Sequence, residues 1–300
     1  MTAVIARTAS EQQVPAERRR PAGTGRSRRL KRVGIYAFLV LGAIPTLLPL
    51  IWLVRSALMT SGQIFISPPE WIPDPVAWDN FAGALTAVPF GRYFVNTMII
   101  EVGVLVGTLL SCSFAAFSFA RLRWRFKNVV FGLLMTGVML PYAVTLIPTF
   151  LFWQAVGAVN TYVPLILPAF FGTAVFNIFL LRQFFLSLPY ELDESAYIDG
   201  ANPFQVYWRI VLPLSKPALM VVGIFTFLGV WNDYLGPLIY LNDSDMYTLA
   251  MGLASFQGTY TAQWGYLMAA ATVVLLPIIL LFAIAQKYFV EGIALTGLKN

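Results

Sequence analysis

The feature that most constrains this chain is a series of six long apolar stretches. An α-helix needs about 20 mainly apolar residues to cross roughly 30 Å of hydrocarbon. The six stretches that meet this length are 33–54, 94–119, 129–153, 163–181, 218–241 and 264–286. The strands of a membrane barrel would be shorter, about 9–11 residues, with alternating apolar and polar side chains. The sequence therefore predicts an all-α, polytopic membrane protein with six transmembrane helices.

Composition agrees with this class and excludes several kinds of chemistry. Hydrophobic residues make up 58% of the chain and charged residues 11%, against about 45–50% and about 25% in globular proteins. The chain contains no histidine, which excludes histidine-based acid–base catalysis and imidazole metal ligands. Its single cysteine, Cys112, excludes an internal disulfide and a thiolate metal cluster. We therefore predict neither catalytic residues nor a metal site.

The positions of lysine and arginine predict the orientation in the membrane. Of the 20 basic residues, 18 lie in the N-terminal tail, in the connections after the second and fourth stretches, and in the C-terminal end. Only Arg55 and Arg92 lie in the opposite connections. Because basic residues accumulate on the cytoplasmic side, both termini are expected in the cytoplasm of a cell-membrane protein.

The two termini are predicted to be cytoplasmic tails, 1–32 and 287–300, that flank a membrane domain over 33–286. The tail 1–32 carries nine basic residues. We interpret it as a disordered topology signal that contacts anionic membrane lipid, and not as a nucleic-acid-binding segment.

The most informative segment is the connection 187–217, which has the pattern of two short amphipathic helices. Acidic residues in the first turn favour a helix over 190–198, and Gly200 suits the left-handed residue that ends it. Asn202 is predicted to cap a second helix, which Pro213 is predicted to end. Such a rigid helix–glycine–helix unit is suited to docking in a groove of a partner and to transmitting its motion.

The same segment carries a family resemblance. Glu194-Ser195-Ala196, followed by Gly200 and then by Ile210-Val211-Leu212-Pro213, resembles the EAA loop of ABC importer permeases. Ser195 departs from the pattern, since alanine is usual there, but it is also small. The segments 180–185, 199–201 and 231–234 resemble the MalG-type branch of carbohydrate permeases, and the similarity extends from about 35 to 298.

The resemblance implies a six-helix permease with a cytoplasmic EAA-type coupling helix, driven by ATP hydrolysis in other chains. Glu194, Ser195, Ala196 and Gly200 are then the residues that dock on an ATPase, while Ile210, Leu212 and Pro213 anchor the unit to the membrane helices. ATP and Mg²⁺ would be bound by the partner ATPase subunits, because this chain has no G-x-x-x-x-G-K-[ST] phosphate loop.

The resemblance also implies the partners and the role. The expected partners are a second, homologous permease subunit, a pair of cytosolic ATPase subunits and an extracytoplasmic solute-binding protein. Together the two permeases would form the pathway for a carbohydrate. Glycerol phosphate or another polar solute is the alternative substrate. A secondary transporter is the alternative class, although it would carry coupling carboxylates in several helices.

Polar residues within the stretches are candidates for contact with the solute. Glu101 is expected to face a wet cavity or a polar partner, because a buried carboxylate is costly in hydrocarbon. Trp231, Asn232, Asp233 and Tyr234 place aromatic rings beside polar groups, a combination that suits sugars. A structural hydrogen bond for Glu101, and an interfacial aromatic belt for Trp231 and Tyr234, explain these residues as well.

Prolines within the stretches are the last feature of note. Each removes a helical hydrogen bond and favours a kink. Pro141 and Pro148 bracket a short segment, so bent helices that line a cavity are one interpretation and ordinary packing is the other.

Overall fold

The computed structural model describes residues 25–258 and 263–297. The predicted tail over 1–24 therefore lies outside the described residues. By its internal contacts the chain divides into a unit that ends at Ile51 and a larger unit that begins at Trp52. The first unit contains most of helix α1 (Gly25–Ala57).

Every regular element in the described ranges is helical. After α1 the helices of the second unit are α2 (Ser61–Ile64), α3 (Asp79–Ala87), α4 (Phe90–Arg121), α5 (Lys127–Val138), α6 (Tyr142–Ala155), α7 (Val163–Ile166), η1 (Leu167–Phe171), α8 (Val175–Ser187), α9 (Glu191–Ile198), α10 (Pro203–Val206), η2 (Tyr207–Val211), α11 (Leu212–Leu214), α12 (Lys216–Trp231), α13 (Leu235–Tyr240), η3 (Ser244–Met246), α14 (Leu249–Ser255) and α15 (Trp264–Gly297).

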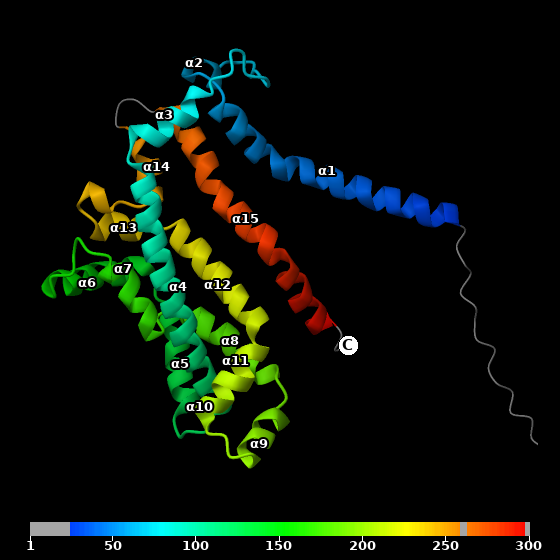
Figure 1. Cartoon of the computed structure of the whole chain (residues 1–300), viewed down its shortest axis with the longest axis vertical. Helices are drawn as coiled ribbons and strands as arrows, with labels where there is room; N and C mark the ends of the chain where they lie inside the picture. The colour runs from blue at the N-terminus through cyan, green and yellow to red at the C-terminus, as the bar shows by residue number, and fades with distance from the viewer. Residues whose placement is uncertain (1–24, 259–262, 298–300) are drawn as a thin grey trace, which may run out of the picture. The chain divides into compact units, whose positions relative to one another are not determined.

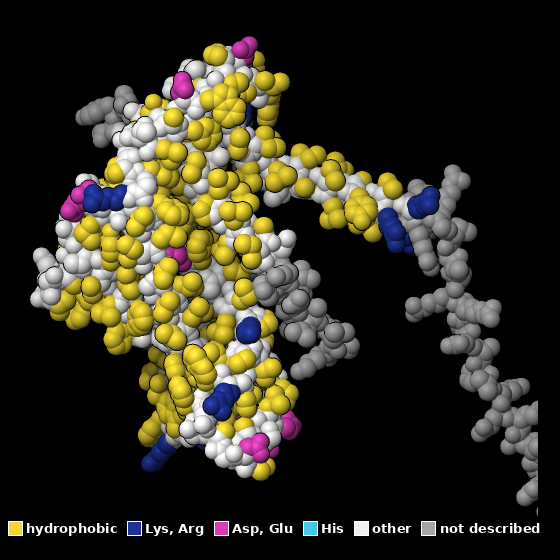
Figure 2. Space-filling model, viewed as in Figure 1, with side chains coloured by type: hydrophobic (Ala, Val, Ile, Leu, Met, Phe, Trp, Pro, Cys, Tyr) yellow, Lys and Arg dark blue, Asp and Glu magenta, His cyan; other side chains and the backbone are white. Residues whose placement is uncertain are grey.

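Four stretches are long and apolar enough to cross a membrane, and two bent pairs of helices raise the number to six if each pair forms one span. The four are Lys31–Ala57, Phe90–Arg121, Val163–Ser187 and Trp264–Gln286. The predicted all-α membrane fold is confirmed over the described residues. Figure 2 shows the second unit with a mainly apolar surface and with lysine and arginine side chains around the end where α9 and α10 lie.

Three of the predicted spans are interrupted rather than continuous. The stretch 129–153 is divided between α5 and α6, whose axes differ by 99°. Pro141 lies at this break, where it supplies no backbone donor, so the kink predicted from proline is confirmed. The stretch 163–181 is broken after η1, where Gly172 takes a left-handed conformation with φ of 67°. The stretch 218–241 is broken between α12 and α13.

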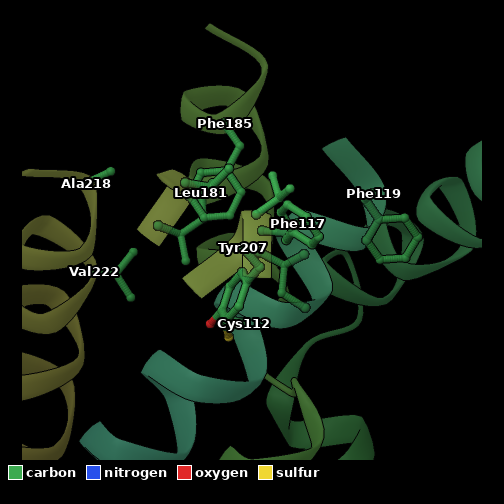
Figure 3. Close-up of a cluster of buried hydrophobic side chains, with 12 residues drawn as sticks. Cys112, Phe117, Phe119, Leu181, Phe185, Tyr207, Ala218 and Val222 are labelled. Atoms are coloured by element: carbon green, nitrogen blue, oxygen red, sulfur yellow. The ribbon is translucent and has the colours of Figure 1, made fainter. Parts of the chain in front are cut away.

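Helix α4 is the centre of the second unit and contacts α8, η1 and α12 along its length. At one end of α4 lie α3 and α14, and at the other end lie α9 and α10 (Figure 1). The main core surrounds Tyr207, whose ring packs among Phe117, Leu181 and Phe185 (Figure 3). The Tyr207 hydroxyl lies 2.8 Å from Ser113 Oγ of α4. The segment predicted to carry the coupling unit is thus anchored in the core by an aromatic side chain.

Candidate functional site

The predicted coupling unit is present as a helix–glycine–helix segment. Helix α9 begins at Glu191, one residue after the predicted start, with acidic residues in its first turn. It ends before Gly200, which has a φ of 81°. A Cβ at Gly200 would meet no other atom, so this position favours glycine for its left-handed conformation and not for lack of space. The predicted role of Gly200 as the turn residue is confirmed in its geometry.

The second helix of the unit begins and ends close to the predicted residues. Asn202 Oδ1 accepts a hydrogen bond of 2.9 Å from Gln205 N, while Gln205 Oε1 accepts one of 2.8 Å from Asn202 N. This reciprocal pair caps α10. The helix continues from α10 through the π-helical turn η2 and through α11 to Leu214, and a bend of 77° then separates it from α12, so the predicted end at Pro213 is confirmed to within one residue. The wider turn accommodates a proline, which has no N–H to donate to the preceding turn.

The predicted docking residues lie largely on the surface. Glu194, Ser195 and Gly200 are exposed, and Ala196 is half-buried. Ile198, which the sequence analysis did not single out, is an apolar residue with 86% of its surface exposed. Its position four residues after Glu194 places it on the same face of α9, and that spacing was the signal available in the sequence. Helix α9 therefore presents an acidic, small and apolar face to its surroundings.

Only one of the three predicted anchor residues packs against the hydrophobic core. Leu212 packs against the core cluster, whereas Ile210 is half-buried outside it and Pro213 is exposed. Val206, Tyr207 and Val211 are instead the fully buried hydrophobic residues of this segment. Tyr207 and Val211 are four residues apart and Val206 directly precedes Tyr207, so the three lie on one face of the helix, and this apolar spacing was the signal available in the sequence.

A buried ion pair that the sequence analysis missed attaches α9 to the end of α4. Arg121 Nη1 lies 3.4 Å from Asp193 Oδ2, and Arg121 Nη2 donates a hydrogen bond of 2.9 Å to the carbonyl oxygen of Leu188. Asp193 is only 1% exposed. Burial raises the pKa of the Asp193 carboxyl, and the positive charge of Arg121 acts in the opposite direction. The pair thus fixes the coupling helix to a membrane-spanning helix.

A cavity of about 430 Å³ lies between the interrupted spans. Its wall comes from α4, α6, α7, η1, α8, α12 and α13 and from the segments that join them. Its residues are Val104, Thr108, Tyr142, Thr149, Trp153, Pro164, Leu165, Pro168, Ala169, Thr173, Ala174, Asn177, Thr226, Asp233, Gly236 and Tyr240. The wall therefore combines hydroxyl groups, one amide, three large aromatic rings and one carboxylate, and contains neither lysine nor arginine.

Of the predicted solute-contacting residues, only Asp233 lies in this wall. Asp233 Oδ1 accepts a hydrogen bond of 3.0 Å from Gly236 N, which fixes the start of α13. Gly236 makes room for this arrangement, since a Cβ there would collide with the Asp233 carboxylate. The carboxylate has a structural role and at the same time borders the cavity.

The other predicted solute contacts lie elsewhere. Trp231 is 2% exposed, and its Nε1 donates a hydrogen bond of 3.2 Å to the carbonyl oxygen of Val274 in α15. Asn232 Nδ2 donates one of 2.8 Å to the carbonyl oxygen of Leu228 at the end of α12. Tyr234 is exposed outside the cavity wall.

Glu101 is 2% exposed on α4 and does not belong to the cavity wall. Among the described residues its carboxylate oxygens find no hydrogen-bond partner. Neither the wet cavity nor the polar partner predicted for it is therefore found within this part of the chain.

Comparison with known proteins places the chain among transport proteins. A family model described as binding-protein-dependent transport system inner membrane component matches residues 107–294. The relative described as probable ABC transporter permease protein YurM of Bacillus subtilis is 36% identical over 270 residues, which cover 89% of this chain and 88% of that protein.

Two relatives with a named solute match over a similar length. The diacetylchitobiose uptake system permease protein of Streptomyces coelicolor is 31% identical and covers 84% of each chain. The sn-glycerol-3-phosphate transport system permease protein of Yersinia pestis is 32% identical and covers 86% of this chain and 94% of that one.

A solved structure shares the fold. A chain in the crystal structure of a bacterial ABC transporter involved in the import of alginate superposes with a TM-score of 0.76 at 22% identity, covering 88% of this chain and 98% of that one.

Proposed function

Because this chain belongs to the family of binding-protein-dependent transport system inner membrane components, we propose that it forms half of the membrane pathway for an uncharged carbohydrate. It is a permease subunit of an ABC importer in the cell membrane, and ATP hydrolysis takes place in partner chains. The carbohydrate is delivered by a solute-binding protein, and a second permease subunit completes the pathway.

The observation that carries the choice of solute is the chemistry of the 430 Å³ cavity. The rings of Tyr142, Trp153 and Tyr240 offer flat apolar surfaces for the C–H faces of a sugar ring. The Asn177 amide and the Thr226 hydroxyl, 3.5 Å apart, offer donors and acceptors for sugar hydroxyls. A site for a neutral polyhydroxylated solute needs both kinds of group.

Charge argues against glycerol phosphate at this cavity. A phosphate group is normally bound by arginine, lysine or uncapped backbone N–H groups. The described wall contains Asp233 and no basic residue, so an anion would be repelled. A neutral solute would not meet this repulsion.

For the coupling of transport to ATP hydrolysis, we propose that the exposed face of α9 docks on one cytosolic ATPase subunit. Glu194, Ser195 and Ile198 present this face, and Asp193 ties it to α4. This role places α9 and both termini in the cytoplasm, as the distribution of basic residues predicts.

Transport by the reconstituted importer tests the choice of solute. The complete complex in vesicles, with its solute-binding protein, is assayed with uncharged oligosaccharides and with glycerol 3-phosphate. We expect saturable, ATP-dependent uptake of an oligosaccharide. Thr226→Val should raise its KM several-fold, because one hydroxyl is lost from the wall. The matched control is Thr136→Val, at an exposed position of α5 outside the wall. Uptake of glycerol 3-phosphate alone would reject the proposal.

Crosslinking tests the docking of α9. The single native cysteine, Cys112, is fully buried, so an introduced cysteine reacts selectively. Ile198→Cys should crosslink to an ATPase subunit, whereas Trp78→Cys, exposed at the opposite end of the second unit, should not. Equal crosslinking of the two variants, or none, would contradict the docking.

A further inference from the structure

The connection between α4 and α5 forms a basic hollow that lies outside the wall of the 430 Å³ cavity. The hollow has a volume of about 450 Å³. Its wall consists of Arg123, Trp124, Arg125, Lys127, Asn128 and Val129. Three of these six residues carry a positive charge and none is acidic. We name this feature the basic hollow.

The three cations are not neutralised by carboxylates. The ion pairs of the described residues are Arg92 with Asp245 and Arg121 with Asp193, and neither involves the basic hollow. Lys127 Nζ donates a hydrogen bond of 3.0 Å to the carbonyl oxygen of Leu122, which holds the connection closed. The side chain of Arg125 lies 5.3 Å from the ring of Phe126. The charges of Arg123 and Arg125 therefore remain available to an anion.

The start of α5 adds partial positive charge to the same wall. The residue before the helix is Phe126, which has no side-chain oxygen to cap it, and the first turn contains no acidic residue. The hydrogen bonds at this start run from Lys127 N to Trp124 O and from Val130 N to Phe126 O. The N–H groups of Asn128 and Val129, both in the wall, are thus without a backbone acceptor. Such N–H groups favour a phosphate.

The position of the basic hollow indicates a lipid rather than a free ion. Arg121, directly before the connection, contacts Leu188 and Asp193, so the hollow lies at the end of the bundle that carries α9. Trp124 and Phe126 are exposed beside it, as is typical of the boundary between hydrocarbon and water. Next to the hollow, Val129 and Leu133 of α5 expose apolar surface on which an acyl chain can lie.

We infer that the basic hollow binds the phosphate group of an anionic membrane lipid, with the acyl chains against α5. Arg123 and Arg125 pair with the phosphate oxygens, and the N–H groups at the start of α5 donate to them. The inference rests on the proposed function in one respect only: the docking of α9 on a cytosolic ATPase assigns the bound lipid to the cytoplasmic leaflet. Lipid retention is measured without solute, so its failure is distinguishable from a failure of the carbohydrate proposal.

Native mass spectrometry of the complete importer tests the inference. The complex is titrated in neutral detergent with phosphatidylglycerol or with phosphatidylcholine. We expect tight retention of phosphatidylglycerol, weakened at least about tenfold by Arg123→Gln with Arg125→Gln, since each basic residue near an anionic surface contributes about fivefold. The matched control, Arg209→Gln with Lys216→Gln, removes two exposed charges from the coupling segment and should retain the lipid as the unmodified complex does.

Three outcomes would overturn the inference. Equal loss of lipid in both double variants would indicate general surface charge. Equal retention of phosphatidylcholine would indicate an apolar groove. Displacement of the lipid by millimolar inorganic phosphate would indicate a free-anion site. If the first double variant does not assemble, the unmodified complex in nanodiscs provides a second test. Brominated phosphatidylglycerol should quench the fluorescence of Trp124 more than brominated phosphatidylcholine does. The Trp124→Phe variant gives the fluorescence of the other tryptophans, which is subtracted.

Discussion

The buried pair of Asp193 and Arg121 makes the mechanical role of α9 testable. Asp193→Asn keeps the shape of the side chain and removes its charge. Both side chains are almost fully buried, with 4% of the Arg121 side chain and 2% of the Asp193 side chain exposed, so solvent does not screen the loss. Removing one partner of a buried pair costs about 3–5 kcal/mol. Two effects reduce this cost: Arg121 keeps its hydrogen bond to Leu188, and the burial that raises the pKa of Asp193 does not oppose a neutral side chain. We therefore take about 2 kcal/mol, which is roughly 30-fold in the equilibrium between attached and detached α9.

The expected result is uncoupling rather than loss of the complex. The ATPase subunits still find the exposed face of α9, so basal ATP hydrolysis persists. Their motion no longer reaches α4 efficiently, so the number of solute molecules taken up per ATP hydrolysed should fall by about an order of magnitude. The assay is parallel measurement of uptake and ATP hydrolysis in vesicles. Glu191→Gln is the matched control, since it also removes one acidic charge from the first turn of α9 but at an exposed position.

A double variant separates attachment from simple instability. Replacing a buried pair by apolar residues of similar volume is often neutral or stabilising. Arg121→Met combined with Asp193→Leu should therefore restore the uptake-to-ATP ratio above that of Asp193→Asn. A wild-type ratio of uptake to ATP hydrolysis in Asp193→Asn would refute the reasoning. A double variant whose defect equalled the sum of the defects of Arg121→Met alone and Asp193→Leu alone would refute it as well.

Three further predictions concern single residues. Glu194→Lys should leave membrane insertion intact and weaken co-purification of the ATPase subunits, because it reverses a charge on the docking face; an unchanged complex would contradict docking there. Gly200→Val should lower the free energy of unfolding of the complex by about 1–2 kcal/mol, since a β-branched residue is strained at a φ of 81°. Thermal unfolding measures this change, and Gly91→Ala should leave it unaltered, because a Cβ at Gly91 meets no other atom. Asp233→Ala should reduce uptake and solute-stimulated ATP hydrolysis, because it removes both the cap of α13 and a polar group of the cavity wall; unchanged activity would exclude Asp233 from the pathway.

The coupling unit could be predicted from the sequence because its signals are local. Asn202 caps its helix through a residue three positions away, and Gly200 takes its left-handed conformation at the end of its own helix. Pro213 could be recognised as the end of the unit because proline cannot donate to the preceding turn, and the helix ends one residue later, at Leu214. The π-helical turn η2 could not be predicted, since it depends on tertiary packing, here on Tyr207 in the core.

The cavity could not be predicted in the same way. Hydropathy identifies continuous apolar stretches, and it therefore joined α5 with α6 and α12 with α13. The breaks bring Tyr142 and Trp153 of α6 to one wall with Tyr240 of α13, a helix that is distant in the sequence. Among polar residues in the spans, the charged Glu101 was predicted to contact the solute, whereas Asn177 and Thr226 were not. Their neutral polar side chains within apolar stretches were the signal available in the sequence.

The structure finally suggests how the two sites communicate. Arg121, the last residue of α4, holds Asp193 of the coupling helix, while Thr108 of the same helix lies in the cavity wall. The two residues are 13 positions apart on uninterrupted helix, which corresponds to about 20 Å at 1.5 Å per residue. The neighbouring spans are broken at Pro141, at Gly172 and before α13, so they can bend around the solute. Because α4 has no such break, we expect a displacement of α9 to reach Thr108 as a rigid-body motion, which the broken spans would accommodate. Transport by such a bundle therefore needs an intact α4 more than any single polar contact in the cavity.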